Sequence, residues 1–130
     1  SGLVGSEMCK ETAPLCTTGI GKAILANLPP EEWLSRLPEI VPAHTPQTIT
    51  DKDKILQELQ STRERGFAID NCEHELNVRC VGVPVYNARG ALVAGISSSG
   101  AVQVMTDRKV MECADILMGI TQRIKERLYA

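Results

Sequence analysis

Aromatic residues are scarce in this sequence. Only 3% of its 130 residues are aromatic, namely one Trp, two Tyr and one Phe. Because proteins that bind single-stranded nucleic acid stack bases on aromatic side chains, this composition argues against such a module. An excess of positive charge is also lacking, since 14 basic residues face 16 acidic ones for a net charge of -2. Phosphate neutralisation dominates DNA binding, so the chain by itself is not expected to bind DNA.

Long apolar runs and a secretion signal are absent as well. The apolar residues 92–96 are followed at once by three serines, and no run approaches the roughly 20 residues that a membrane-spanning helix needs. The first five residues lack the charged and apolar regions of a signal peptide, and no initiator methionine is present. We therefore expect one soluble domain over residues 1–130, with no membrane partner, that is a fragment of a longer protein.

The cysteines and histidines show no metal-binding or disulfide pattern. Five cysteines cannot all pair with one another, and none of them forms a Cys-x-x-Cys pair. Their dispersed positions do not resemble a small secreted disulfide framework, which favours a reducing cytoplasm. His44 and His74 lack the spacing typical of a structural zinc site. We expect neither a metal nor another cofactor, and interpret the thiols as buried or incidental.

Helical spacing of apolar residues predicts four helices. They cover residues 18–28, 31–37 and 51–65, and a final stretch that opens at Thr106 and Asp107 and continues to Leu128. Thr50 is the expected N-cap of the third helix and Gly66 its end. In the last helix, apolar residues including Ile120 recur at steps of three and four, which predicts that it covers a sheet face.

Alternating residues predict strands in the second half of the chain. The expected strands cover residues 67–70, 78–86 and 91–99, with a further short one near residues 3–9. Residues 87–90 supply turn residues between the last two strands, which therefore form a hairpin. No repeat or domain boundary is evident, so helices and antiparallel strands should share one core as an α+β domain.

The two faces of this hairpin differ in character. If Tyr86 pairs with Ala91, then Gly82 lies opposite Gly95, Cys80 opposite Ser97 and Val78 opposite Ser99. The other face is densely aliphatic. Because small side chains leave volume unfilled and serine hydroxyls donate hydrogen bonds, the first face is a candidate ligand cavity. Alternatively, a helix lies directly on these small residues and leaves no cavity.

Three further features carry possible chemistry. Residues 17–22 (TTGIGK) place free backbone N–H groups at a helix start, where they could receive an anionic group. Because the Walker A spacing is missing, an ordinary helix start with close packing at Gly19 and Gly21 is favoured over a nucleotide site. Asp70 is a base, a ligand-orienting acceptor or a plain loop residue. Cys80 as nucleophile with His74 as base is the enzyme alternative, although a thiol within a strand is more often a buried apolar group.

Four segments together resemble a known family. They are residues 13–26 (APLCTTGIGKAILA), 63–70 (RERGFAID), 78–86 (VRCVGVPVY) and 94–100 (AGISSSG). In this order and spacing they resemble the C-terminal effector-binding domain of IclR-type transcriptional regulators, over nearly the whole chain. The resemblance implies a GAF-like fold, in which helices flank a curved antiparallel sheet. It also implies that a winged helix-turn-helix domain, and the first helix and strands of the effector domain, precede these residues.

The resemblance also implies the function. The domain would sense a small carboxylate, such as an oxo-acid, sugar acid or aromatic acid, without catalysis, and DNA would be bound only through the missing domain of a homodimer or homotetramer. The ligand-binding positions would be Gly19, Ile20, Gly21, Asp70, Val78, Cys80, Ser97 and Ser99. Two departures from the family pattern concern the loop after Asp70. Cys72 replaces the first member of an acidic pair that Glu73 completes, and Asn77 stands where glycine is common.

Two rival functions remain open from the sequence. In the first, the chain is an oligomerisation module whose hairpin face is filled and whose pocket is vestigial. In the second, it is a GAF-like enzyme that uses Cys80.

Overall fold

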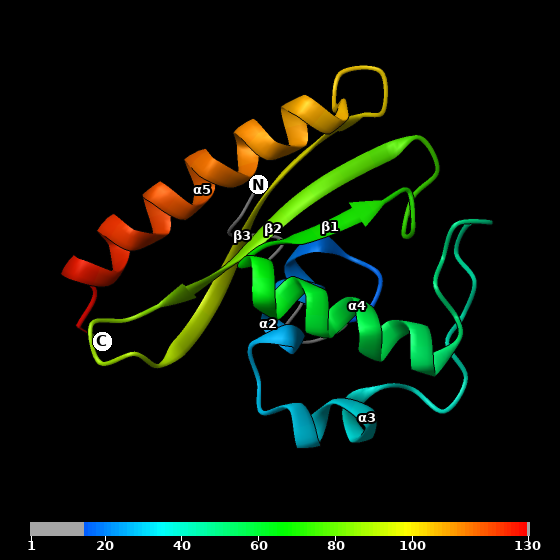
Figure 1. Cartoon of the computed structure of the whole chain (residues 1–130), viewed down its shortest axis with the longest axis horizontal. Coiled ribbons are helices and arrows are strands. Elements are labelled where there is room, and N and C mark those ends of the chain that lie inside the picture. The colour runs from blue at the N-terminus through cyan, green and yellow to red at the C-terminus, as the bar shows by residue number, and fades with distance from the viewer. Residues whose placement is uncertain (1–14, 130) are drawn as a thin grey trace.

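The computed structural model describes residues 15–129 and combines helices with one antiparallel sheet (Figure 1). In chain order the elements are α2 (Gly19–Ala26), the 3₁₀ helix η1 (Pro30–Glu32), α3 (Trp33–Arg36), α4 (Lys52–Arg65), β1 (Ala68–Asn71), β2 (Val78–Tyr86), β3 (Leu92–Ala101) and α5 (Asp107–Arg127). The strands lie in the order β1-β2-β3. Helix α5 covers one face of the sheet and α2 the other, with α4 packed on α2. The predicted α+β class is confirmed.

Helix α4 begins one residue later than predicted, because Asp51 rather than Thr50 is its N-cap. The Asp51 carboxylate accepts hydrogen bonds from the N–H groups of Asp53 (2.8 Å) and Lys54 (3.3 Å). Losing such a cap typically costs about 1 kcal/mol. Gly66 ends the helix as predicted, since its φ of 91° lies in the left-handed region that glycine adopts readily.

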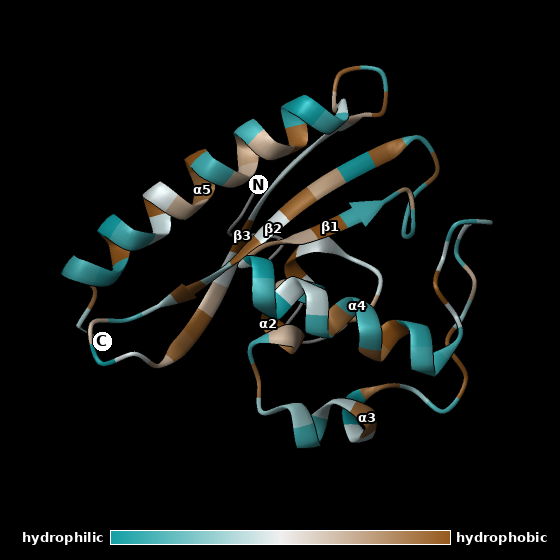
Figure 2. Ribbon diagram, viewed as in Figure 1, coloured by the Kyte–Doolittle hydropathy of each residue, from teal (hydrophilic) through white to brown (hydrophobic). Residues whose placement is uncertain are grey.

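The core between α5 and the sheet is aliphatic, and apolar segments of both elements are visible in Figure 2. Its buried members are Phe67, Val81, Val83, Met105, Val110, Ala114 and Leu117. Each fully buried Val or Leu contributes about 1.5–3 kcal/mol relative to an exposed position. This confirms that the last helix covers a sheet face. Ile120, which the periodicity also placed on the inward stripe, is 37% exposed.

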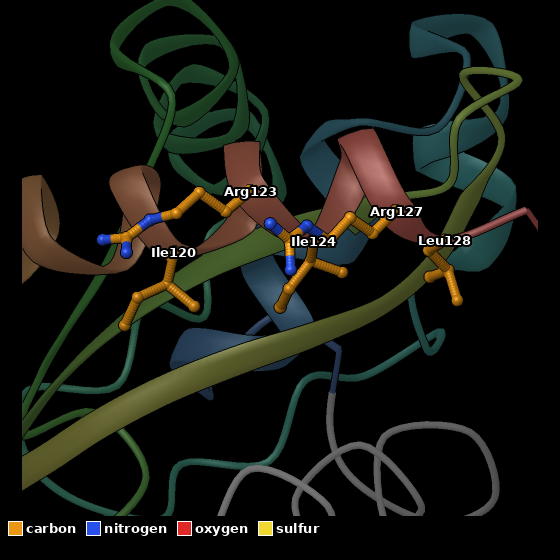
Figure 3. A pocket seen from close by; sticks show the side chains of 5 residues that line it. All are labelled: Ile120, Arg123, Ile124, Arg127 and Leu128. Carbon is orange, nitrogen blue, oxygen red and sulfur yellow. The ribbon is translucent and has the colours of Figure 1, made fainter.

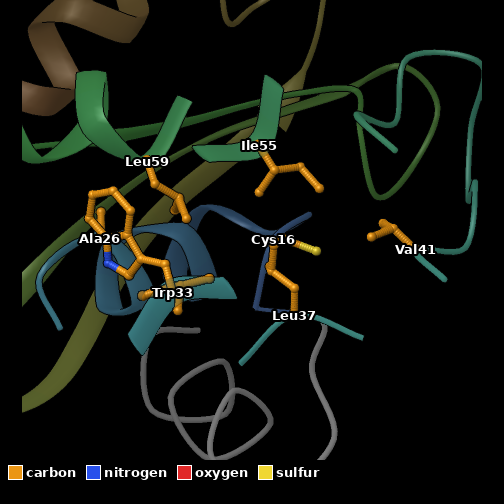
Figure 4. Packing of buried hydrophobic residues seen from close by; sticks show 8 residues of the cluster. Cys16, Ala26, Trp33, Leu37, Val41, Ile55 and Leu59 are labelled. Atoms are coloured by element: carbon orange, nitrogen blue, oxygen red, sulfur yellow. The ribbon is translucent and has the colours of Figure 1, made fainter. Parts of the chain in front are cut away.

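A second core holds α2 against α3 and α4 (Figure 4). Its buried members are Cys16, Leu25, Ala26, Trp33, Leu37, Val41, Ile55 and Leu59. The Trp33 indole N–H donates to the Leu28 carbonyl at 3.2 Å, so the ring is buried with its polar atom paired. Helix α2 is thereby packed between the sheet and α4, which fixes where its N-terminus meets the strands.

The hairpin has the predicted faces but a different register. Tyr86 lies opposite Leu92 and Val85 opposite Ala94, so Val93 is an extra residue that forms a bulge in β3. The resulting pairs are Val78 with Ala101, Cys80 with Ser99, Gly82 with Ser97 and Pro84 with Gly95. The predicted partners of Val78, Cys80 and Gly82 are therefore wrong by two residues. Because side chains alternate with a period of two, each of them keeps its predicted face.

The remaining elements agree with prediction to within a few residues. The expected helix 31–37 is divided into η1 and α3, and the strand near residues 3–9 lies outside the described residues. Among the helices in residues 15–129, none is both long enough and apolar enough to span a bilayer.

Candidate functional site

Cys80 lies where α2 and all three strands meet. Across the sheet, Asp70 of β1 and Ser99 of β3 are its direct neighbours. The hydroxyl groups of Ser99 and Ser97 and the backbone of Gly19 hydrogen-bond to its Sγ. The structure thus brings together five of the eight predicted site residues, from four separate elements.

Helix α2 covers part of the small-residue face. A Cβ on Gly82 would collide with the Gly19 carbonyl group, and a Cβ on Gly19 would lie 2.8 Å from the Cys80 Sγ. At Gly95, the Ile20 side chain occupies the space above the strand. Over Gly82 and Gly95, α2 therefore lies directly on the sheet and leaves no cavity, which is the alternative that the sequence left open. The part of this face beyond the helix start carries Cys80 and Ser99.

The amide groups at the start of α2 have different partners. The Gly21 N–H donates to the Thr18 hydroxyl at 3.0 Å, as in an ordinary N-cap. The Gly19 N–H points to Cys80. The N–H groups of Gly19 and Gly21 are therefore both directed at partners within the domain.

Asp70 is buried and holds the loop that follows β1. Its Oδ1 accepts a hydrogen bond from the Glu73 N–H at 2.8 Å. Burial raises the pKa of its carboxyl group, while the Glu73 N–H, the Lys22 charge and the His74 N–H oppose that rise. Asp70 is therefore a structural acceptor within the loop, and the same face of the sheet carries the Cys80 thiol.

The β1–β2 loop contains two residues with left-handed backbone. Asn77 has φ of 64°, so asparagine keeps the conformation that glycine commonly provides, as expected. Cys72 has φ of 58° and is buried, and its carbonyl accepts a hydrogen bond from the Thr45 hydroxyl. Both departures from the family pattern thus lie at residues with left-handed backbone.

Sequence reasoning missed the role of Lys22. Its side chain is buried, and its Nζ lies 2.7 Å from the Oε1 of Glu73. Burial raises the pKa of the Glu73 carboxyl group, and the charge and hydrogen bond of Lys22 oppose that rise. The available signal was a single charged residue within the small and apolar helix GIGKAILA, which predicts a buried partner of opposite charge.

Cys80 and His74 have different neighbours. Burial raises the pKa of the Cys80 thiol, against the hydrogen bonds from Ser99 and Ser97. The His74 ring contacts the His44 ring, with centroids 5.0 Å apart. A thiol with a raised pKa is a poor nucleophile at neutral pH, which weighs against the enzyme alternative.

Within residues 15–129, no group of three or more His, Cys, Asp or Glu is placed to hold a metal ion.

Three cavities are lined by described residues, and the predicted site residues line none of these three. One of about 540 Å³ lies beside the C-terminal half of α5, where Ile120, Ile124 and Leu128 point toward the sheet (Figure 3). Another of about 360 Å³ lies near Thr17. The third, of about 440 Å³, lies near Arg79. Cys80 lines none of these three cavities, although Ile69, Asn71 and Glu73, which surround Asp70, line the third.

The family of the chain follows from its match to a family model. The model for the C-terminal domain of the bacterial transcriptional regulator IclR matches residues 8–126. The chain belongs to the IclR family. The resemblance inferred from four sequence segments is confirmed, and the fold is the GAF-like α+β fold of IclR C-terminal domains.

Relatives of this IclR-family chain include proteins of greater length. The HTH-type transcriptional regulator BhcR of Paracoccus denitrificans is 34% identical over 105 residues, which cover 80% of this chain and 38% of BhcR. The crystal structure of Thermotoga maritima IclR has a TM-score of 0.80 at 38% identity and covers 89% of this chain and 47% of that chain. The chain therefore spans less than half the length of either protein.

A third relative was crystallised with a small acid. It is a double mutant of the inducer-binding domain of the PobR transcription factor from Acinetobacter, in complex with 3-hydroxybenzoic acid. Its structure has a TM-score of 0.79 at 26% identity and covers 88% of this chain and 69% of that chain. BhcR and PobR are both named as regulators of transcription.

Proposed function

We propose that this domain senses a small organic carboxylate and thereby regulates transcription by the protein of which it is part. One observation carries the proposal: α2 and all three strands converge on Cys80. Hydrogen-bond donors of the Gly19 backbone and of Ser97 and Ser99 surround one point, with the Asp70 carboxyl group beside it. The PobR complex supports the proposal, because a domain of the same family and fold holds a hydroxylated aromatic acid.

The donors suit the carboxylate of the ligand. In the proposed complex this group accepts hydrogen bonds from the Gly19 and Ile20 amides and from the Ser97 and Ser99 hydroxyls. A helix N-terminus carries partial positive charge, which adds a favourable interaction with an anion. Each charge-assisted hydrogen bond contributes roughly 1.5–3 kcal/mol. Two or three such bonds together contribute roughly 3–9 kcal/mol, and the entropy loss of the ligand offsets part of this, so apolar contacts must supply the rest of a millimolar to micromolar affinity.

The remaining residues fit the body of the ligand. Asp70 accepts a hydrogen bond from a ligand hydroxyl group or a bound water. Val78, half-buried at the start of β2, and Ile20 provide an apolar wall. Gly21 keeps the helix start narrow, and its amide joins the site when a ligand oxygen replaces the Thr18 hydroxyl.

Regulation requires a second state. The effector must bind two conformations or assemblies with different affinity, since equal affinity shifts no equilibrium. In the proposed mechanism, a winged helix-turn-helix domain outside these 130 residues binds the DNA. The effector then changes the geometry of a homodimer or homotetramer and thereby the affinity for the operator.

The proposal is tested by thermal shift and isothermal titration with pyruvate, gluconate and 3-hydroxybenzoate. At least one acid should stabilise the protein, and Ser97→Ala should weaken its binding about tenfold, as expected for the loss of one charge-assisted bond. Ser98→Ala is the matched control, because Ser98 lies on the opposite face, across from Val81. Stabilisation by none of the acids, or equal effects of both variants, would contradict the proposal.

One observation favours the rival function of an oligomerisation module. The α2 backbone fills the space above Gly82, as a vestigial pocket requires. Ser97→Leu separates the two functions: in a sensor it abolishes the response to the acid and leaves the assembly intact. Loss of assembly in this variant, measured by sedimentation, together with no acid response in the unaltered protein, would favour the rival.

A further inference from the structure

A buried ion pair joins α2 to the strand and loop that carry Asp70. Lys22 is 1% exposed, and its Nζ lies 2.7 Å from the Oε1 and 2.8 Å from the Oε2 of Glu73. The same Nζ donates to the Ile69 carbonyl at 2.7 Å. The Glu73 Oε2 also accepts from the Asn71 N–H at 2.9 Å. Lys22 and Glu73 thus connect the first turn of α2 to backbone atoms on both sides of Asp70.

Each residue of the ion pair is directly connected to a residue of the proposed site. Lys22 follows Gly19 by about one helical turn, so the two residues move together as part of one rigid helix. The backbone N–H of Glu73 donates to the Asp70 Oδ1 at 2.8 Å. A displacement of Lys22 relative to Glu73 therefore changes the separation between the Gly19 amide and the Asp70 carboxyl group.

Stability does not account for the burial of this pair. Taking two charges out of water is costly, and replacing a buried ion pair by apolar side chains of similar volume is often neutral or stabilising. An apolar pair, however, has no directional contacts. The Lys22 ammonium group holds acceptors on Glu73 and Ile69 together, so the ion pair sets a distance that apolar packing leaves loose.

We infer that Lys22 and Glu73 are positioning residues that set the spacing between the α2 start and Asp70, and thereby the affinity of the site for its carboxylate. The inference rests on the proposed function of the site. In the proposed complex neither side chain touches the ligand, because Lys22 and Glu73 bond to each other and to backbone atoms of Ile69 and Asn71. Each acts through another residue, Lys22 through Gly19 and Glu73 through Asp70.

The test is the double variant Lys22→Met/Glu73→Leu in the complete polypeptide that contains these residues. It removes both charges at similar volume, so the protein should stay folded, and the midpoint of urea unfolding should fall only because the Ile69 carbonyl and the Asn71 N–H lose their partners. Affinity for the tightest-binding acid among pyruvate, gluconate and 3-hydroxybenzoate should fall about tenfold. The pH midpoint of Cys80 alkylation by iodoacetamide should rise, because the Sγ loses the hydrogen bond from Gly19.

Two further variants complete the experiment. Arg108→Met/Glu112→Leu removes an exposed ion pair of α5 and should change neither the affinity nor the Cys80 midpoint. Glu73→Asp keeps both charges but shortens the side chain by one methylene. If the double variant does not fold, Glu73→Asp should still lower the affinity and shift the Cys80 midpoint.

A folded double variant with unchanged affinity and an unchanged Cys80 midpoint would overturn the inference. If the double variant does not fold, the same two unchanged values in a folded Glu73→Asp variant would do so. A different result separates the two proposals. If none of the three acids binds the unaltered protein, the proposed function fails, while the Cys80 midpoint still decides whether the ion pair positions the start of α2.

Discussion

Gly82 of β2 lies directly beneath Gly19 of α2, so close that a Cβ on Gly82 would meet the carbonyl carbon and oxygen of Gly19. Two residues without side chains thus allow the start of a helix to rest on the middle of a strand. This contact brings the Gly19 backbone to Cys80 and places it beside Ser97 and Ser99. The geometry of the proposed site depends on that contact.

Gly82→Ala should therefore destabilise the domain and weaken acid binding. Backbone atoms of α2 cannot rotate away as a flexible side chain would, and overpacking of this kind costs about 1–3 kcal/mol. Gly119→Ala is the control, since nothing lies within 4 Å of its Cβ position and alanine favours a helix by up to about 1 kcal/mol. Urea unfolding measures both. Equal stability of the two variants would contradict the close contact.

Asn77 should tolerate glycine but not valine. Its φ of 64° is left-handed, and a β-branched residue there costs about 1–2 kcal/mol. Because the Asn77 side chain is exposed, little packing is lost in either variant. Leu76→Val, at the exposed neighbouring position, is the control and should leave the unfolding free energy nearly unchanged. A stable Asn77→Val variant would show that the loop adopts another conformation.

Acidification should lower stability through His74. Burial, and then the charge of His44, hold the pKa of His74 below its ordinary value of 6.5. The unfolded chain then binds a proton at His74 more readily than the folded protein does. The contribution of neutral His74 to the free energy of unfolding is therefore complete above pH 6.5 and is lost as the pH falls toward the pKa of the folded state. The difference in unfolding free energy between the unaltered protein and His74→Gln, measured from pH 8 to pH 5, should shrink over this range.

The carboxyl groups of Asp70 and Glu73 change the stability with pH in the opposite direction to His74. The prediction therefore concerns the difference in unfolding free energy between the unaltered protein and His74→Gln. Burial raises the pKa of Asp70 above 3.8 and that of Glu73 above 4.5. Their contribution to stability is greatest below those ordinary values and is lost as the pH rises through the raised ones. Subtracting the His74→Gln curve cancels these two terms. A difference that stays flat with pH would contradict the environment assigned to His74.

Cys80→Ser should preserve the response to the acid. A serine hydroxyl can keep hydrogen bonds with Ser99, Ser97 and Gly19, and burial makes the native thiol a weak nucleophile. Affinity should change by less than about threefold, corresponding to less than about 0.7 kcal/mol. Isothermal titration checks this, with mass spectrometry of the acid after incubation. Conversion of the acid by the unaltered protein, abolished in Cys80→Ser, would support the enzyme alternative instead.

Much of the fold was accessible from sequence because local rules determine it. The two-residue alternation of the strands placed Cys80, Ser97 and Ser99 on one face of the hairpin, and in the structure these side chains lie on one face. The register was missed because the bulge at Val93 depends on how the hairpin packs rather than on a local signal. A slip of two residues leaves the face unchanged, so the predicted cluster was insensitive to the error.

The site was less accessible because its contacts join distant segments. Lys22 and Glu73 are separated by 51 positions, and nothing in either local sequence identifies the other as its partner. The approach of Gly19 to Gly82 similarly depends on the packing of α2 between the sheet and α4. The family resemblance supplied the positions of the site, whereas the means by which they are held together required the structure.

The central claim is that a carboxylate binds beside Cys80 at the start of α2. A crystal structure of the protein with the acid that stabilises it most tests this directly. We predict density for the carboxylate within hydrogen-bond distance, about 2.7–3.2 Å, of the Gly19 amide and of the Ser97 or Ser99 hydroxyl. An ordered acid in the cavity beside Ile120 and Leu128, with no density beside Cys80, would contradict the claim.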